Sequence, residues 1–409
     1  MPENLTIIYL VYMFVVLYFL LLFTLVFVQN RKQIFSDPKT IKKYSLSVLI
    51  PAFNEQESIK GTVESVLKSD YKNLKEIIII NDGSTDNTLK IAKQLEKKYS
   101  KVRVLNKKNS GKADSLNRAL KIVKTELVTV VDADSYPDKD GLSSMVGYFD
   151  DEEVGAVTTR ILVRNKNNFI RKMQSVEYKV IAFTRKLLGF LDSIYVTPGP
   201  LALYRKSALS QIKGFDKKNM TEDIEATWHL IHDGYKVRMS FMSKVSTVAP
   251  DTLKKWFKQR IRWNIGGFQT ILKYKHCFFR KGMLGFFILP FFSISLILGS
   301  FGLGIFIYRI LRRFAYSYLI ANYSVEAQTA IIALNDINLN PSVLNFLGIV
   351  LFILGLGFVF FALGIINRHI RERESFFSVI FYSLIYILLR PVVLIVSLYK
   401  FFTKKYSWR

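Results

Sequence analysis

Four long apolar runs constrain this chain more than any other feature of its sequence. They cover residues 5–28, 283–310, 343–366 and 375–399, and the last one is interrupted by Arg390. A helix of roughly 20 apolar residues is long enough to cross a hydrocarbon core of about 30 Å. The first run lacks the preceding basic residues and the following cleavage site of a signal peptide, so it predicts a retained anchor. The sequence therefore predicts a multi-pass protein of the cell membrane.

The second and fourth runs leave two interpretations open. Pro290 and three glycines can break the second run, and Arg390-Pro391 interrupts the fourth. Each of these runs is therefore either a transmembrane helix or a re-entrant or interfacial segment. The segment 271–282 is expected to form an interfacial helix, and residues 311–342 an extracytoplasmic loop.

Basic residues accumulate between the first two runs. The chain carries a net charge of +26, and residues 31–282 alone hold 47 Lys and Arg against 27 Asp and Glu. The positive-inside rule places this segment in the cytoplasm. Such an excess is also typical of nucleic-acid binding, but here the charge is spread out, without an aromatic–basic repeat. We expect a basic domain beside an anionic lipid leaflet, and no nucleic-acid partner.

Cysteine and histidine residues predict neither a disulfide nor a metal site. Cys277 is the only cysteine, so the sequence predicts no intramolecular disulfide and no cysteine-based metal site. His229 and His232 are three residues apart on a predicted helix, without a third ligand nearby in the sequence. An ordinary surface pair is the favoured interpretation of these two histidines.

Residues 44–270 have the pattern of an α/β domain inserted between the membrane segments. Apolar strands are predicted at 46–53, 75–82, 102–106 and 127–134, with amphipathic helices near 57–68, 86–98 and 112–123. Strands that are apolar throughout, separated by helices, favour a mostly parallel sheet with helices on both faces. Further along, a strand near 155–164 and helices near 168–188, 222–232 and 252–275 are expected.

Polar residues follow the predicted strands at their carboxyl ends, where parallel sheets bind ligands. Asp82 can accept a hydrogen bond from a uracil ring, or it can serve only the turn in which it lies. Asp132 and Asp134 can hold Mg²⁺ or Mn²⁺ together with a diphosphate. Lys112 either approaches a phosphate or is an exposed lysine in the first turn of a helix.

Two later motifs carry further polar groups. Asp223 begins a predicted helix, where the helix dipole favours an acid, and it can alternatively act as a general base on an acceptor hydroxyl. Gln259, Arg262 and Trp263 share one helix face at their spacing. Trp263 is either a membrane-interface anchor or a stacking surface for a sugar.

These motifs, in this order, resemble glycosyltransferase family 2. The segments are PAFNE (51–55), NDGS (81–84), DAD (132–134), TED (221–223) and QRIRW (259–263). The set is similar to the membrane-bound processive synthases of cellulose, hyaluronan, chitin and poly-β-1,6-N-acetylglucosamine, and most similar to the last. The sequence departs from the family pattern at Asn81, where many members have an acid, and at the TPGP turn (197–200).

The resemblance implies a GT-A fold and an inverting, metal-dependent transfer from a UDP-sugar, with UDP-GlcNAc as the expected donor. It implies Asp223 as the base, and Asp134 with Asp132 as ligands of Mg²⁺ or Mn²⁺. The residues that it assigns to the nucleotide and donor are Pro51, Asn54, Glu55, Asp82, Lys112 and Asp132. Those that it assigns to the acceptor and diphosphate are Gln259, Arg262, Trp263, Glu222, Gly199 and Pro200.

Three functions follow as hypotheses. The first is extension of a β-linked polysaccharide with coupled translocation, and the second is a single transfer to a lipid-linked glycan acceptor. The third is a non-catalytic nucleotide-binding or transport protein of the lipid bilayer. The QRIRW motif favours the first over the second, and the presence of both DAD and TED argues against the third. The involvement of a partner subunit is left open.

Overall fold

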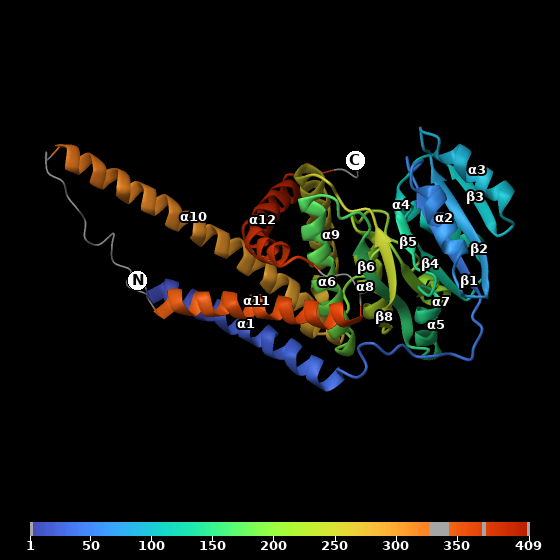
Figure 1. Ribbon diagram of the computed structural model, residues 1–409, viewed down its shortest axis with the longest axis horizontal. Coiled ribbons are helices and arrows are strands. Elements are labelled where there is room, and N and C mark those ends of the chain that lie inside the picture. Colours follow the sequence, from blue (N-terminus) through green and yellow to red (C-terminus); the bar gives the residue numbers. More distant parts are fainter. Residues whose placement is uncertain (1–2, 327–342, 370–373, 407–409) are drawn as a thin grey trace.

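A computed structural model describes residues 3–326, 343–369 and 374–406 (Figure 1). A twisted sheet with its covering helices forms one end of the molecule, and long apolar helices form the other. Helices α6 (Phe169–Phe190) and α9 (Leu253–Tyr274) lie between these two parts. The site described below is built where these two helices meet the sheet.

The first half of the sheet is parallel, as the apolar strands predicted. Strands β1 (Leu46–Ala52), β2 (Leu74–Asp82), β3 (Val102–Lys107) and β4 (Leu127–Val130) pair in the order β3-β2-β1-β4. Every residue of β1 is buried, because both of its faces are covered. Helices α2 (Ile59–Leu67) and α3 (Thr88–Lys98) pack on one face, and α4 (Lys112–Ile122) packs on the other.

The second half makes the sheet mixed. Strand β7 (Ala202–Arg205) joins β4 and β6 (Val154–Val163) by antiparallel pairing, and β8 (Lys236–Thr247) runs parallel to β6. The short strand β5 (Ser135–Pro137) closes this edge against β8. Short helices α5 (Ser143–Val146), η1 (Gly147–Asp150) and α7 (Lys206–Gln211) complete the domain. The eight strands form one sheet with helices on both faces, which confirms the predicted α/β class.

Helices α6, α8 (Glu222–His232) and α9 connect the sheet to the apolar helices. Side chains cap two of them: Asn168 accepts from the Arg171 N–H, and Thr252 from the Lys255 N–H. Thr221 occupies the N-cap position of α8, but its hydroxyl donates to the Asn219 side chain instead. Helix α6 packs on β6, while α9 packs on α8 and α12 (Phe376–Phe402).

Four of the described helices contain stretches long and apolar enough to cross a membrane. They are α1 (Glu3–Asn30), α10 (Leu289–Glu326), α11 (Val343–His369) and α12. Helix α1 lies along α11, and α10 packs against α12 (Figure 1). The fourth apolar run forms one continuous helix that includes Pro391.

Two expected segments differ in the structure. Residues 271–282 do not form a helix of their own: α9 continues to Tyr274, and η2 (Lys275–Cys277) follows. Phe279, Lys281 and Gly282 then take left-handed backbone conformations, which no helix accommodates, before η3 (Leu284–Ile288) leads into α10.

The second difference concerns the loop expected at residues 311–342. Helix α10 continues to Glu326, since residues 305–326 contain no glycine or proline to end it. The remainder of that expected loop, residues 327–342, lies outside the described residues. Residues 407–409 also lie outside the described residues.

Candidate active site

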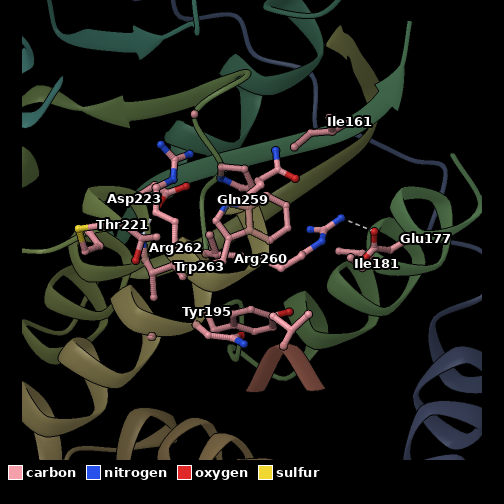
Figure 2. Close-up of a pocket in the computed structure, with 18 of the residues that line it drawn as sticks. Ile161, Glu177, Ile181, Tyr195, Thr221, Asp223, Gln259, Arg260, Arg262 and Trp263 are labelled. Carbon is pink, nitrogen blue, oxygen red and sulfur yellow. Dashed lines mark hydrogen bonds and ion pairs between the residues drawn. The ribbon is translucent and has the colours of Figure 1, made fainter. Parts of the chain in front are cut away.

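A cavity of about 640 Å³ begins at the carboxyl ends of the strands and reaches the apolar helices (Figure 2). It passes the N-terminus of α8 and the exposed face of α9, and it continues between α10 and α12. The structure brings together most of the predicted site residues in its lining: Lys112, Asp132, Asp134, Gly199, Pro200, Glu222, Asp223, Gln259, Arg262 and Trp263.

Lys112 holds two acidic groups together at the strand end of this cavity. Its Nζ lies 2.6 Å from Asp132 Oδ1 and 2.8 Å from Glu222 Oε1. Burial by itself would lower the pKa of Lys112, but the two carboxylates outweigh burial and raise it. Lys112 therefore carries its charge inside the cavity, which excludes the alternative of an exposed surface lysine.

Gly199 makes room for this pair of charges. Its carbonyl accepts from the Asp132 N–H at 3.1 Å, which holds the TPGP turn against the DAD segment. A Cβ atom on Gly199 would lie 2.5 Å from Lys112 Nζ and 2.7 Å from both carboxylate oxygens of Asp132. A side chain at this position would displace the Lys112 ammonium or the Asp132 carboxylate, so glycine is favoured here by close approach rather than by an unusual backbone conformation.

Asp134 lies in a pocket of like charge. Burial, with the neighbouring carboxylates of Asp132 and Glu55, raises its pKa to about 7. Ser135 donates a hydrogen bond to Asp134 Oδ1 at 3.2 Å. A hard divalent cation would relieve the repulsion between Asp132 and Asp134, and carboxylate oxygens are its preferred ligands. The donor set therefore fits the predicted Mg²⁺ or Mn²⁺ site.

Asp223 and Glu222 are adjacent carboxylates with opposite pKa shifts. Burial, with the charge of Glu222, raises the pKa of Asp223 to about 6, although the Ile224 N–H donates to its Oδ1 at 3.0 Å. For Glu222, Lys112 outweighs burial and lowers the pKa. Burial thus offsets the helix N-terminus at Asp223, and a carboxylate with a raised pKa is the better proton acceptor.

Helix α9 presents its motif to the same cavity. Gln259 Oε1 is buried and has no hydrogen-bond partner within the described part of the chain. The Arg260 guanidinium lies 4.0 Å from the centroid of the Trp263 ring and pairs with Glu177 of α6 (Figure 2). This contact holds the indole along the cavity wall, which favours a role of Trp263 in the cavity over that of a membrane-interface anchor.

The approach of α9 to α8 depends on Gly266. A Cβ atom there would collide with the Thr221 side chain, at 2.0 Å from its Oγ1. Asn219 Nδ2 also donates to Thr270 Oγ1 at 2.9 Å, which ties the loop before α8 to α9. These contacts place the TED and QRIRW motifs on adjoining walls of one cavity.

The remaining predicted residues lie outside the cavity lining. Asp82 is buried and accepts from the N–H groups of Ser110 and Gly111, each at 2.9 Å, and it pairs with Lys107. It thus supports the loop that carries Lys112. Pro51 is buried in β1, Asn54 accepts from the Thr85 N–H at 2.9 Å, and Glu55 accepts from Ser58. Ligand contacts by these four residues stay predictions.

Several lining residues were not foreseen from the sequence. They include Tyr178 and Arg185 of α6, Tyr195, and Phe292 and Ser295 of α10. Helix α6 has the pattern of an ordinary amphipathic helix, so nothing in its sequence distinguishes the residues that face the cavity. Arg390 of α12 also lines it, and a single charge within an apolar run is a signal of function.

Residues 47–213 match the model of glycosyl transferase family 2. This chain carries a glycosyl transferase family 2 domain. Over 230 residues it is 33% identical to the poly-beta-1,6-N-acetyl-D-glucosamine synthase of Staphylococcus aureus (strain COL). This match covers 56% of this chain and 56% of the synthase. The synthase of the same name from Staphylococcus epidermidis is 33% identical over 252 residues, or 61% of each chain. The chain thus spans little more than half the length of these curated relatives.

The fold of the family 2 domain is GT-A. The mannosyltransferase PcManGT from Pyrobaculum calidifontis, solved in complex with GDP-Man and Mn²⁺, superposes with a TM-score of 0.52 at 18% identity. The match covers 77% of this chain and 94% of the mannosyltransferase. With its four helices of membrane-spanning length, the chain is a membrane protein that carries a GT-A domain.

Proposed function

We propose that this chain is an inverting membrane glycosyltransferase that adds N-acetylglucosamine from UDP-GlcNAc to a growing β-linked polysaccharide. The observation that carries the proposal is the continuity of the cavity from Asp132 and Asp134, past Asp223, to Arg390 between α10 and α12. The Staphylococcus relatives are named for a poly-N-acetylglucosamine product, which supports N-acetylglucosamine as the transferred sugar. The QRIRW motif (259–263) favours this extension of a polymer over a single transfer to a lipid-linked acceptor.

In the proposed reaction, Asp223 removes a proton from the acceptor hydroxyl. That oxygen attacks the anomeric carbon of the donor, the bond from this carbon to the diphosphate breaks, and UDP leaves. Attack from the face opposite to UDP inverts the anomeric configuration. Trp263 stacks on the acceptor sugar. The buried Gln259 Oε1 accepts a hydrogen bond from a hydroxyl group of that sugar. Both contacts orient the acceptor toward Asp223.

Cations around the diphosphate would stabilise its departure. Arg262 lines the cavity beside Glu222, and Lys112 lies at the strand end. A divalent cation held by Asp132 and Asp134 would neutralise the charge that develops on the diphosphate. When the donor enters, its diphosphate competes with Asp132 and Glu222 for the ammonium group of Lys112. Lys112 can then exchange its ion pairs with the two carboxylates for an ion pair with the diphosphate.

The domain arrangement belongs to the same proposal. Residues 44–270 are the catalytic domain, and the basic excess of residues 31–282 supports a cytoplasmic position. The helices α1, α10, α11 and α12 then cross the membrane, and the acceptor leaves the cavity between α10 and α12. Arg390 lies on this route and can donate hydrogen bonds to sugar hydroxyls.

A donor panel tests the function. Full-length protein in nanodiscs is expected to release UDP from UDP-GlcNAc in preference to UDP-glucose, UDP-glucuronate and UDP-GalNAc. Because Asp132 and Asp134 require a cation, a chelator is expected to abolish release, and Mg²⁺ or Mn²⁺ alone to restore it. Sizing of the product then separates a polymer from a single transfer. Absence of UDP binding would refute the glycosyltransferase proposal. Undiminished turnover under chelation would refute the dependence of transfer on a divalent cation at Asp132 and Asp134.

The rate of transfer is expected to fall as the pH decreases through about 6. The pKa of Asp223 is raised to about 6, so the carboxylate that accepts the proton is converted to the neutral acid below this pH. The measurement is kcat against pH at saturating donor and Mg²⁺, which keeps Asp134 ionised. UDP binding over the same range is the control, and a rate that is unchanged well below pH 6 would exclude Asp223 as the base.

A further inference from the structure

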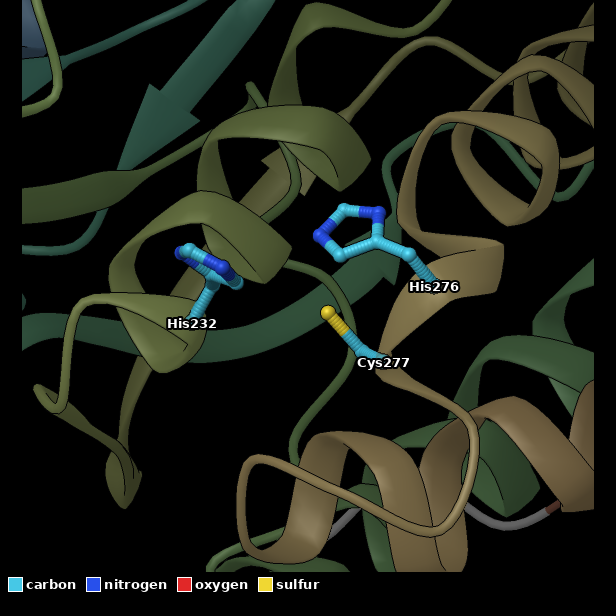
Figure 3. A group of neighbouring side chains, drawn as sticks. All are labelled: His232, His276 and Cys277. Atoms are coloured by element: carbon cyan, nitrogen blue, oxygen red, sulfur yellow. The ribbon is translucent and has the colours of Figure 1, made fainter.

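A second group of metal-binding side chains lies at the other end of α8. His232, at the C-terminus of this helix, faces His276 and Cys277 of η2 (Figure 3). One potential ligand atom from each residue lies within 4.8 Å of the other two. The sequence predicted a surface pair of His229 and His232 and no cysteine-based site. Folding instead brings His232 close to His276 and Cys277, which lie more than forty positions later in the chain.

The donor atoms of this group suit a borderline-soft metal. Two imidazole nitrogens and one thiolate sulfur are ligands that Zn²⁺ takes in tetrahedral sites, whereas Mg²⁺ and Mn²⁺ prefer oxygen. The sulfur of Cys277 points into the space between the two imidazole rings (Figure 3). We infer that His232, His276 and Cys277 form a zinc site, with water as the fourth ligand, separate from the cation site at Asp132 and Asp134.

The surroundings of the group match those of metal sites in proteins. Asp233 Oδ1 lies 2.9 Å from His232 Nδ1, so a proton on Nδ1 is shared with the carboxylate and Nε2 keeps its lone pair. A carboxylate behind a ligating histidine orients the ring and makes it more basic. Cys277 is fully buried in an apolar cluster with Trp228, Leu284 and Ile288, while His276 is exposed and opens the site to solvent.

The position of the site indicates what zinc would do. It joins the end of α8 to η2, immediately before the turn that leads into α10. Asp223 lies at the opposite end of α8, and both α8 and α10 line the cavity. Zinc would therefore fix the connection between the GT-A domain and α10, the first long apolar helix that follows the domain. Its expected effect is on the stability of this junction rather than on a chemical step.

The test uses Zn²⁺ and Co²⁺ on the full-length protein in nanodiscs, after treatment with a chelator and in excess Mg²⁺. One equivalent of zinc is expected to bind and to raise Tm. Cobalt is expected to give the absorption of a tetrahedral complex, including a thiolate-to-metal charge-transfer band. Cys277→Ser should abolish that band, and Asp233→Asn should lower zinc affinity by roughly 10- to 100-fold.

Matched variants keep the inference open to refutation. His276→Gln provides a second test in case Cys277→Ser fails to fold. Because His276 is exposed, this change leaves the apolar core intact, and it should weaken zinc binding. His229→Gln, one turn earlier on α8, should bind zinc like the wild type. Zinc binding that is equal in the wild type, Cys277→Ser and His276→Gln would overturn the inference, as would the absence of binding. Because the readouts are binding and Tm, failure of the glycosyltransferase proposal would leave this result unaffected.

Discussion

Asp223→Asn is expected to reduce sugar transfer by about 10²- to 10⁴-fold, the usual contribution of a positioned general base. Asparagine has nearly the same shape as aspartate, but it cannot accept the proton of the acceptor hydroxyl. Asp223 is half-buried in the cavity wall and makes no ion pair within the described residues, so its replacement should leave the fold intact. The measurement is UDP release with UDP-GlcNAc, compared with UDP binding.

Two controls define this result. UDP binding by Asp223→Asn should match that of the wild type, because Lys112, Asp132 and Asp134 are unchanged. Asp70→Asn, an equal change at an exposed position distant from the cavity, should retain full turnover. Normal turnover in Asp223→Asn would show that another group accepts the proton. A loss of both turnover and UDP binding would indicate instead that Asp223 helps to hold the donor.

Glu177→Ala is expected to lower the free energy of unfolding by about 3–5 kcal/mol. Glu177 of α6 pairs with Arg260 of α9, and their side chains are only 2% and 9% exposed. Removal of the carboxylate breaks this buried ion pair and leaves the charge of Arg260 less well compensated, which costs more than the pair itself contributes. Denaturation of the protein in mild detergent, followed by tryptophan fluorescence, measures the loss.

A paired substitution separates the charge from the packing. Glu177→Leu combined with Arg260→Met replaces the ion pair by apolar side chains of similar volume, and its stability is expected to be close to that of the wild type. Glu177→Gln, which keeps the size of the side chain, should resemble Glu177→Ala. If the double variant were as unstable as Glu177→Ala, packing rather than the unpaired charge would account for the loss.

The regular elements of the family 2 domain could be predicted from the sequence because their signals are local. The four isoleucines at 77–80 are apolar on both faces of the sheet, and the start of α8 at Glu222 follows from its acidic first turn. The order PAFNE, NDGS, DAD, TED and QRIRW was sufficient to predict the family and the GT-A fold. The local pattern did not reveal that β4 ends at Val130. The Val131 N–H still donates to the Leu49 carbonyl of β1, but the Asp132 N–H donates to the carbonyl of Gly199 in the TPGP turn.

What only the tertiary structure decided is which of these groups meet. Lys112 could be a surface lysine until the fold placed it between Asp132 and Glu222, and Arg390 could belong to a span or a re-entrant segment until α12 placed it on the cavity. The grouping of His232 with Cys277 was likewise hidden. The sequence by itself determined the apolar helices, the parallel strands β1 to β4 and the chemical groups of each motif, because hydrophobic periodicity and residue type act over a few positions. It did not predict β5 or β8. Contacts between residues distant along the chain depend on how whole elements pack, and no local pattern encodes them.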